Sequence, residues 1–149
     1  MTTVEFTARV DIPHSPEKVF RYLADPRNRP EWQSSLLSVT LFDRGEPRVG
    51  MTWRDNTMVA LRPTLEITEL VPFKLWAEVG HWRGITATLT LRFKAISIGC
   101  RVDGAGSLNG TGPWSVPVKA AGKVAGPAIR HDLARVGEIL TRGRLQREA

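Results

Sequence analysis

The residues best suited to chemistry in this sequence are tryptophans with charged neighbours. Trp53-Arg54-Asp55 and His81-Trp82-Arg83 each place an indole beside groups that exchange protons or form hydrogen bonds. Such groups polarise a carbonyl or move a proton when they lie within hydrogen-bond reach of a ligand. In an extended segment, alternation puts Trp53 and Asp55 on one face and Arg54 on the other. The three therefore cannot share one site, and a surface Arg-Asp neighbour pair is the simpler interpretation.

The chain contains five tryptophans but a single tyrosine. Tryptophan offers a large apolar face and an indole donor, which suits both a packed core and the wall of a pocket for a flat or ring-containing molecule. For Trp32 and Trp76 the sequence leaves both interpretations open.

Other catalytic and metal-binding patterns are missing from the sequence. His14, His81 and His131 lie far apart, and none has metal-ligand spacing to another histidine, cysteine or acid. There is no nucleophile elbow, no phosphate-binding glycine loop and no dinucleotide fingerprint. Cys100 is interpreted as a small buried hydrophobic residue. We therefore expect no metal and no cofactor, and the catalytic residues, if any, stay unknown.

Length and composition favour one soluble domain over residues 1–149. At 42% apolar residues, a chain of 149 residues can bury a sizeable core. One cysteine and the lack of a long apolar run predict a cytoplasmic protein without a membrane span. The net charge is +6, but the arginines are scattered, and the basic residues from Arg130 to Arg147 fit a solvated helix face. We therefore expect no nucleic-acid partner.

Alternation of apolar and polar residues predicts an antiparallel sheet. The clearest strands are residues 4–12 and 85–93, and weaker ones are predicted over residues 36–42, 50–55, 64–70, 74–79 and 100–108. Ser15 and Pro16 are typical of a helix start after the first strand, and Pro30 opens a second short helix.

The C-terminal region is predicted in two parts. Residues 119–126 are rich in alanine and glycine, which is a weak helix signal, whereas Pro127 begins an amphipathic helix that includes Leu133 and Val136. This helix is the long element available to cover the apolar face of the sheet. A curved sheet and one helix cannot touch everywhere, so we expect an apolar cavity between them. The residues expected to contact a ligand there are Trp32, Trp53, Asp55, Trp76, His81, Leu89, Leu91, Val102 and Leu133.

The sequence resembles the helix-grip superfamily of polyketide cyclase/dehydrase-like proteins, lipid-transfer domains and birch-pollen-allergen relatives. The residues that carry the resemblance are Val10-Asp11-Ile12-Pro13, Ser15 to Phe20, Asp25-Pro26, Pro30-Glu31-Trp32, Gly50, Glu69 to Phe73 and the closing helix. The resemblance implies an α+β fold in which a curved six- to seven-stranded antiparallel sheet wraps around a long C-terminal helix, with two short helices after the first strand. Pro113, Pro117 and Pro127 depart from the family pattern, which implies a differently shaped cavity mouth.

Three functions follow from the resemblance and from the charge pattern. The first is binding of a small hydrophobic ligand, lipid or polyketide-like, in an internal cavity of a monomer or dimer. The second is a polyketide cyclase/dehydratase-type enzyme, with Arg54, Asp55 and His81 as candidates to polarise a carbonyl. The third is a protein-interaction module that uses its basic terminal helix.

Overall fold

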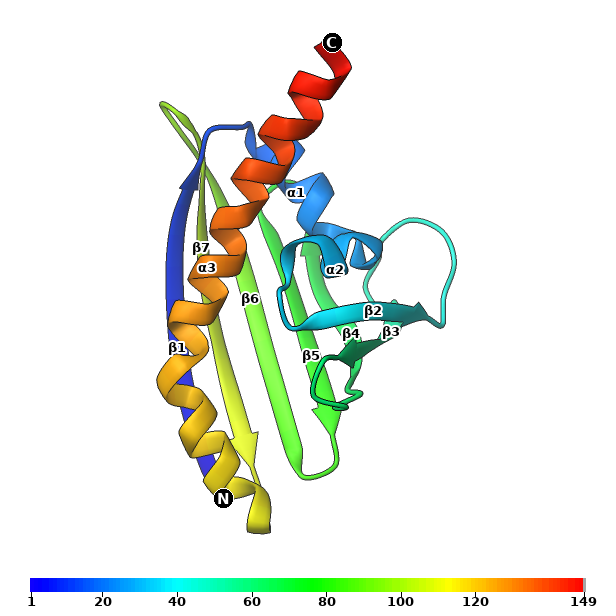
Figure 1. Cartoon of the computed structure of the whole chain (residues 1–149), viewed down its shortest axis with the longest axis vertical. Coiled ribbons are helices and arrows are strands. Elements are labelled where there is room, and N and C mark those ends of the chain that lie inside the picture. The colour runs from blue at the N-terminus through cyan, green and yellow to red at the C-terminus, as the bar shows by residue number, and fades with distance from the viewer. Residues whose placement is uncertain (149) are drawn as a thin grey trace.

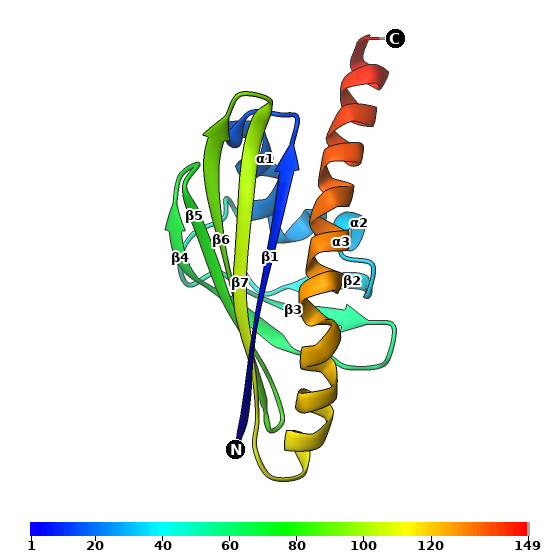
Figure 2. The ribbon, with the colours of Figure 1, turned by 90° about the vertical axis from the view of Figure 1, so that its left-hand side faces the viewer.

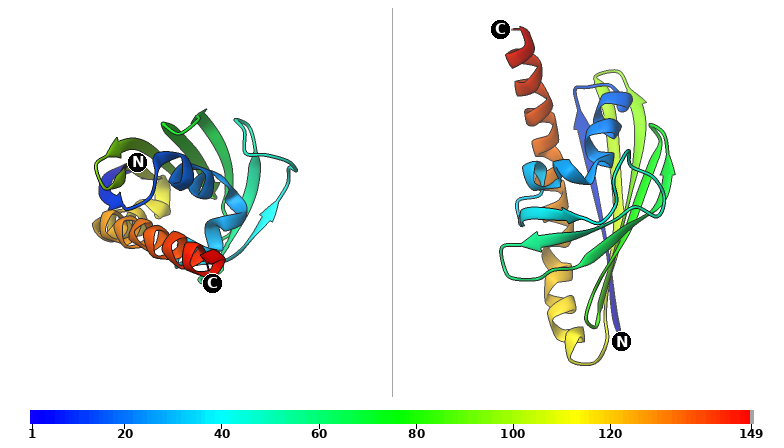
Figure 3. Two further views of the ribbon diagram at one scale, coloured as in Figure 1. Left: turned by 90° about the horizontal axis from the view of Figure 1, so that it is seen from above. Right: turned by 90° about the vertical axis from the view of Figure 1, so that its right-hand side faces the viewer.

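The computed structural model describes residues 1–148, and within them a seven-stranded antiparallel sheet curves around one long helix (Figures 1 and 3). The elements are β1 (Thr2–Ile12), α1 (Pro16–Ala24), a 3-10 turn (Pro26–Asn28), α2 (Arg29–Trp32), β2 (Leu36–Leu41), β3 (Thr52–Thr57), β4 (Thr64–Val71), β5 (Leu75–Trp82), β6 (Ile85–Ile96), β7 (Gly99–Gly110), a second 3-10 turn (Gly112–Trp114) and α3 (Ser115–Glu148). The strand order is β1-β7-β6-β5-β4-β3-β2. The predicted helix-grip fold is confirmed.

The first short helix begins where the sequence predicts, and the second begins at Arg29, one residue before the predicted Pro30. The Ser15 hydroxyl accepts a hydrogen bond from the Lys18 amide at 3.2 Å, and Pro16 occupies the first turn of α1. Asp25 ends α1, and its side chain then accepts from the Arg27 amide at the start of the 3-10 turn. These caps place α1 and α2 over one end of the sheet (Figure 1).

The predicted start of the C-terminal helix at Pro127 is wrong, because α3 begins at Ser115. Its early glycines are packing residues: a Cβ atom on Gly122 would overlap Val4, and one on Gly126 would lie 3.0 Å from the carbonyl oxygen of Thr7. Close contact with β1 therefore stabilises a segment of low intrinsic helix propensity (Figure 2). Pro127 stays inside the helix, where its missing N–H removes one backbone hydrogen bond.

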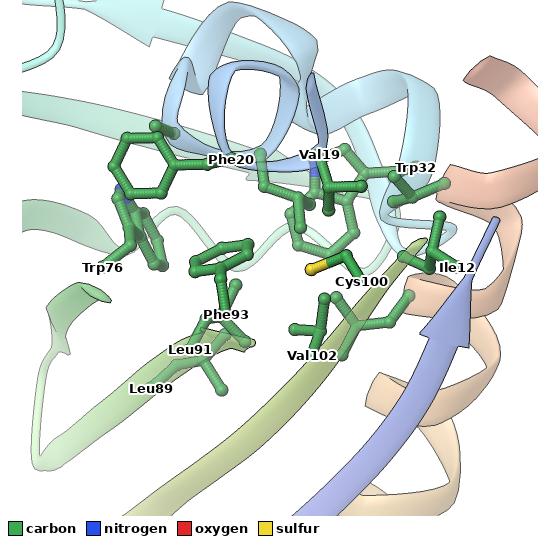
Figure 4. Packing of buried hydrophobic residues seen from close by; sticks show 14 of the residues in the cluster. Ile12, Val19, Phe20, Trp32, Trp76, Leu89, Leu91, Phe93, Cys100 and Val102 are labelled. Atoms are coloured by element: carbon green, nitrogen blue, oxygen red, sulfur yellow. The ribbon is translucent and has the colours of Figure 1, made fainter. Parts of the chain in front are cut away.

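The apolar core lies at the end of the sheet beneath α1 and α2. Figure 4 shows Phe93, Cys100 and Val102 of the sheet packed below Val19 and Phe20 of α1. The Phe20 and Phe93 rings meet edge to face, with centroids 5.2 Å apart. This end of the inner sheet face is closed by the protein's own side chains.

Candidate functional site

The other end of the inner sheet face is not closed in this way. The pairing of β5, β6 and β7 places four further side chains on the same face of the sheet as the buried Leu89. They are Trp82, Ile85, Ala87 and Leu108. All four are only partly buried, and none belongs to the packed core cluster. We call these four residues the open half of the inner face. They form an apolar surface that the described side chains do not fully cover.

A buried ion group of Arg29, Asp55 and Glu78 lies where the packed core meets the open half. On β5, Glu78 pairs with Leu89 of the core, and the next inward position, Gly80, pairs with Ala87 of the open half. All three charged side chains are at least nine-tenths buried. Three elements, α2, β3 and β5, therefore converge on one polar group inside an apolar interior.

Arg29 donates two hydrogen bonds to Asp55. Its Nε and Nη2 atoms donate to the two Asp55 carboxylate oxygens at 3.2 and 2.9 Å, and the Trp53 indole donates to the same carboxylate at 3.0 Å. The guanidinium also lies over the Trp53 ring, 5.2 Å from its centroid. Asp55 is thus held by charge-assisted hydrogen bonds that fix its position.

Glu78 is less well satisfied than Asp55. Its Oε2 atom lies 3.2 Å from Arg29 Nη1, but the two atoms are not oriented for a hydrogen bond, and neither has another partner within residues 1–148. Burial raises the pKa of Glu78 to about 7, the guanidinium of Arg29 opposes this rise, and the charge of Asp55 adds to it. Glu78 can therefore gain or lose a proton near neutral pH.

The raised pKa of Glu78 predicts that stability falls as pH rises from about 4.5 to about 7, because the folded state holds a proton that the unfolded chain has released. The Glu78→Gln variant should lack this fall, whereas the exposed Glu66→Gln control should keep it. Urea unfolding at about pH 5 and about pH 8 measures the difference. Equal pH dependence of Glu78→Gln and the unmodified protein would contradict the assignment.

The structure buries all but one of the residues expected to contact a ligand. The buried ones are Trp32, Trp53, Asp55, Trp76, Leu89, Leu91, Val102 and Leu133. His81 instead lies exposed on the outer face of β5, with Nδ1 at 3.3 Å from the Thr86 hydroxyl, because it alternates with the inward Gly80 and Trp82. Arg54 also lies on the outer face and contacts Asn56. His81 and Arg54 therefore cannot join Asp55 in one site.

Sequence reasoning missed Arg29 and Glu78. Glu78 carries a usable signal, because it alternates with Trp76 in a predicted strand and so shares its inward face. Arg29 carries no comparable signal, since α2 is a single turn whose orientation depends on tertiary contacts.

A surface groove with a volume of about 960 Å³ lies elsewhere in the described chain. It extends over β1, β7 and β6 beside α3, and its walls include Arg9, Asp103, Arg92 and Arg130. Arg9 and Asp103 form an ion pair across it at 2.5 Å. Charged side chains on its walls distinguish this groove from the open half, whose four residues are apolar.

A known family model matches most of the chain. Residues 3–140 match the family model described as polyketide cyclase / dehydrase and lipid transport. No curated protein matches the chain significantly. In residues 1–148 no helix is both long and apolar enough to cross a membrane.

Solved structures with low sequence identity share the fold. Protein MLL2253 from Mesorhizobium loti is 17% identical, with a TM-score of 0.72 over 93% of this chain and 97% of that one. Ara h 8.0201 is 14% identical, with a TM-score of 0.68 over 93% and 99%. The hypothetical protein jhp0584 from Helicobacter pylori is 11% identical, with a TM-score of 0.70 over 93% and 87%.

Proposed function

Because the chain belongs to the polyketide cyclase/dehydrase and lipid transport family, we propose that it binds a small hydrophobic molecule, lipid or polyketide-like, against the open half of its inner sheet face. The observation that carries this proposal is the partly exposed apolar surface of Trp82, Ile85, Ala87 and Leu108. Covering apolar surface contributes about 25 cal/mol per Å², so a bound apolar molecule gains affinity there without displacing the packed core.

The surroundings of the open half support access for an apolar molecule. Thr64 pairs with His81, so the turn between β3 and β4 leaves the sheet at the end where Trp82 lies. Met58 and Val59 of this turn are 65% and 72% exposed. Exposed apolar side chains at such an edge favour contact with a hydrophobic molecule as it enters.

Filling the open half should weaken ligand binding. In Ala87→Trp a large ring occupies the inner face, so the dissociation constant of the neutral fluorescent probe N-phenyl-1-naphthylamine should rise by about tenfold or more. The matched control is Ala105→Trp, because Ala105 is exposed on the outer face and lines the charged groove. Fluorescence titration of both variants measures the effect.

Two results would overturn the proposal. The first is unchanged probe affinity in Ala87→Trp together with a loss in Ala105→Trp, which would move the site to the outer groove. The second is the absence of any bound lipid or polyketide-like molecule in native mass spectrometry across a broad panel of such ligands.

An enzyme of the cyclase/dehydratase type is the second candidate function, and the Glu78 carboxyl favours it. A group whose pKa is about 7 is suited to accept and return a proton at neutral pH. In this alternative, Arg29 would polarise a substrate carbonyl while Glu78 removes a proton from the neighbouring carbon. Glu78→Gln should then abolish turnover of a polyketide-like substrate but preserve its binding, and retained turnover would end this alternative.

A further inference from the structure

Two atoms of the buried ion group have no hydrogen-bond partner, and they indicate which polar group a ligand would carry. Arg29 Nη1 is an unused donor and Glu78 Oε2 an unused acceptor, 3.2 Å apart. A hydroxyl group can accept from the first and donate to the second. A ketone oxygen can accept from Nη1 while protonated Glu78 donates to it.

Two more buried donors lie on the same elements. The indole nitrogen of Trp32, one turn after Arg29 on α2, has no hydrogen-bond partner within residues 1–148. The same holds for Trp76, the inward neighbour of Glu78 on β5. A buried donor without a partner is unfavourable, so an oxygen acceptor on a ligand that reached either indole would be stabilised.

The charges of the ion group favour a neutral hydroxyl or ketone oxygen on the ligand over a carboxylate oxygen. One guanidinium already faces two carboxyl groups, Asp55 and Glu78, and no other charged group perturbs Glu78 strongly. A ligand carboxylate would add a further negative charge to a buried group that has no second cation. A neutral hydroxyl or ketone supplies the same hydrogen bonds without that cost.

We propose that the ion group of Arg29, Asp55 and Glu78 selects ligands by their head group, so that alcohols and ketones bind and carboxylates of the same chain length are rejected. This inference rests on the proposed function, since it names the chemical class that the same site accepts. It makes the interior specific for neutral oxygenated hydrophobic molecules.

The test is displacement of N-phenyl-1-naphthylamine by three molecules of equal chain length: 1-dodecanol, 2-dodecanone and dodecanoate. At about pH 6, where Glu78 is mostly protonated and can donate, the ketone should displace the probe at concentrations about tenfold lower than dodecanoate. At about pH 8, where Glu78 is mostly ionised and accepts from a hydroxyl group, the alcohol should do so. Between about pH 6 and about pH 8 the preference for the alcohol over dodecanoate should increase with pH, because Glu78 loses its proton.

Glu78→Gln supplies the internal control, because it keeps the side-chain shape and removes the charge. In this variant the preference for alcohol over carboxylate should shrink by about threefold or more and lose its pH dependence, whereas the exposed Glu66→Gln should behave like the unmodified protein. Equal or tighter binding of dodecanoate to the unmodified protein would overturn this inference alone, as would an unchanged preference in Glu78→Gln. If neither the probe nor any of the three molecules binds, the proposed function falls and the inference falls with it.

Discussion

Replacing Arg29 by methionine is expected to lower the free energy of unfolding by roughly 3–5 kcal/mol at neutral pH. Arg29 is 2% exposed and contacts both Asp55 and Glu78, so its loss leaves two buried carboxyl groups without a cation. Methionine fills much of the same space, which limits the cavity contribution. Urea denaturation followed by tryptophan fluorescence measures the change.

Arg27→Met is the matched control for this change. Arg27 lies two residues earlier, its side chain is 42% exposed, and it pairs with Asp25 at 3.1 Å, so its loss should cost at most about 1 kcal/mol. Lowering the pH should reduce the cost of Arg29→Met, because the two carboxyl groups can then take up protons. A loss for Arg29→Met no larger than that for Arg27→Met would contradict a structural role of the ion group.

The second large effect is expected where α3 touches β1. Gly122→Ala should destabilise the protein by about 1–3 kcal/mol, because the added Cβ overlaps Val4 and pushes the helix away from the strand. Alanine is the better helix former by up to about 1 kcal/mol, so a helix without this contact would be stabilised by the same change. A decrease in the free energy of unfolding of Gly122→Ala therefore indicates overlap with Val4, and an increase indicates the higher helix propensity of alanine.

Gly143→Ala tests the opposite sign within the same helix. A Cβ atom there would meet only Arg147 Nη1, at an ordinary 3.5 Å, so helix propensity alone should stabilise the protein by about 0.5–1 kcal/mol. Thermal unfolding of both variants gives the comparison. A stabilising Gly122→Ala would show that the contact with β1 does not hold α3 in place.

The strands could be predicted from the sequence because their signal is local. The alternation of apolar and polar residues in 4–12 and 85–93 predicts which side chains face inward. The alternating burial of side chains in β1 and β6 agrees with this prediction. The same rule correctly placed Trp53 and Asp55 on one face of β3 and Arg54 on the other.

The start of α3 could not be predicted in this way. The glycine and alanine residues in 119–126 predict a low helix propensity when they are considered without tertiary contacts. In the structure, Gly122 and Gly126 allow α3 to approach β1 closely. Arg29 was missed for a similar reason, since its ion partner Asp55 is 26 residues away and comes from another element. Features set by contacts between distant segments leave little trace in local patterns.

The position of β1 in the sheet determines when the sheet can be completed during synthesis. In the described chain β1 pairs with β7 alone, and these are the first and last strands in chain order (Figure 2). The hairpins β4–β5 and β5–β6 can form as soon as they leave the ribosome, but β1 must wait with both edges unpaired until residues 99–110 emerge. The nascent N-terminal strand is therefore the segment most exposed to aggregation, and the one that a chaperone would protect longest.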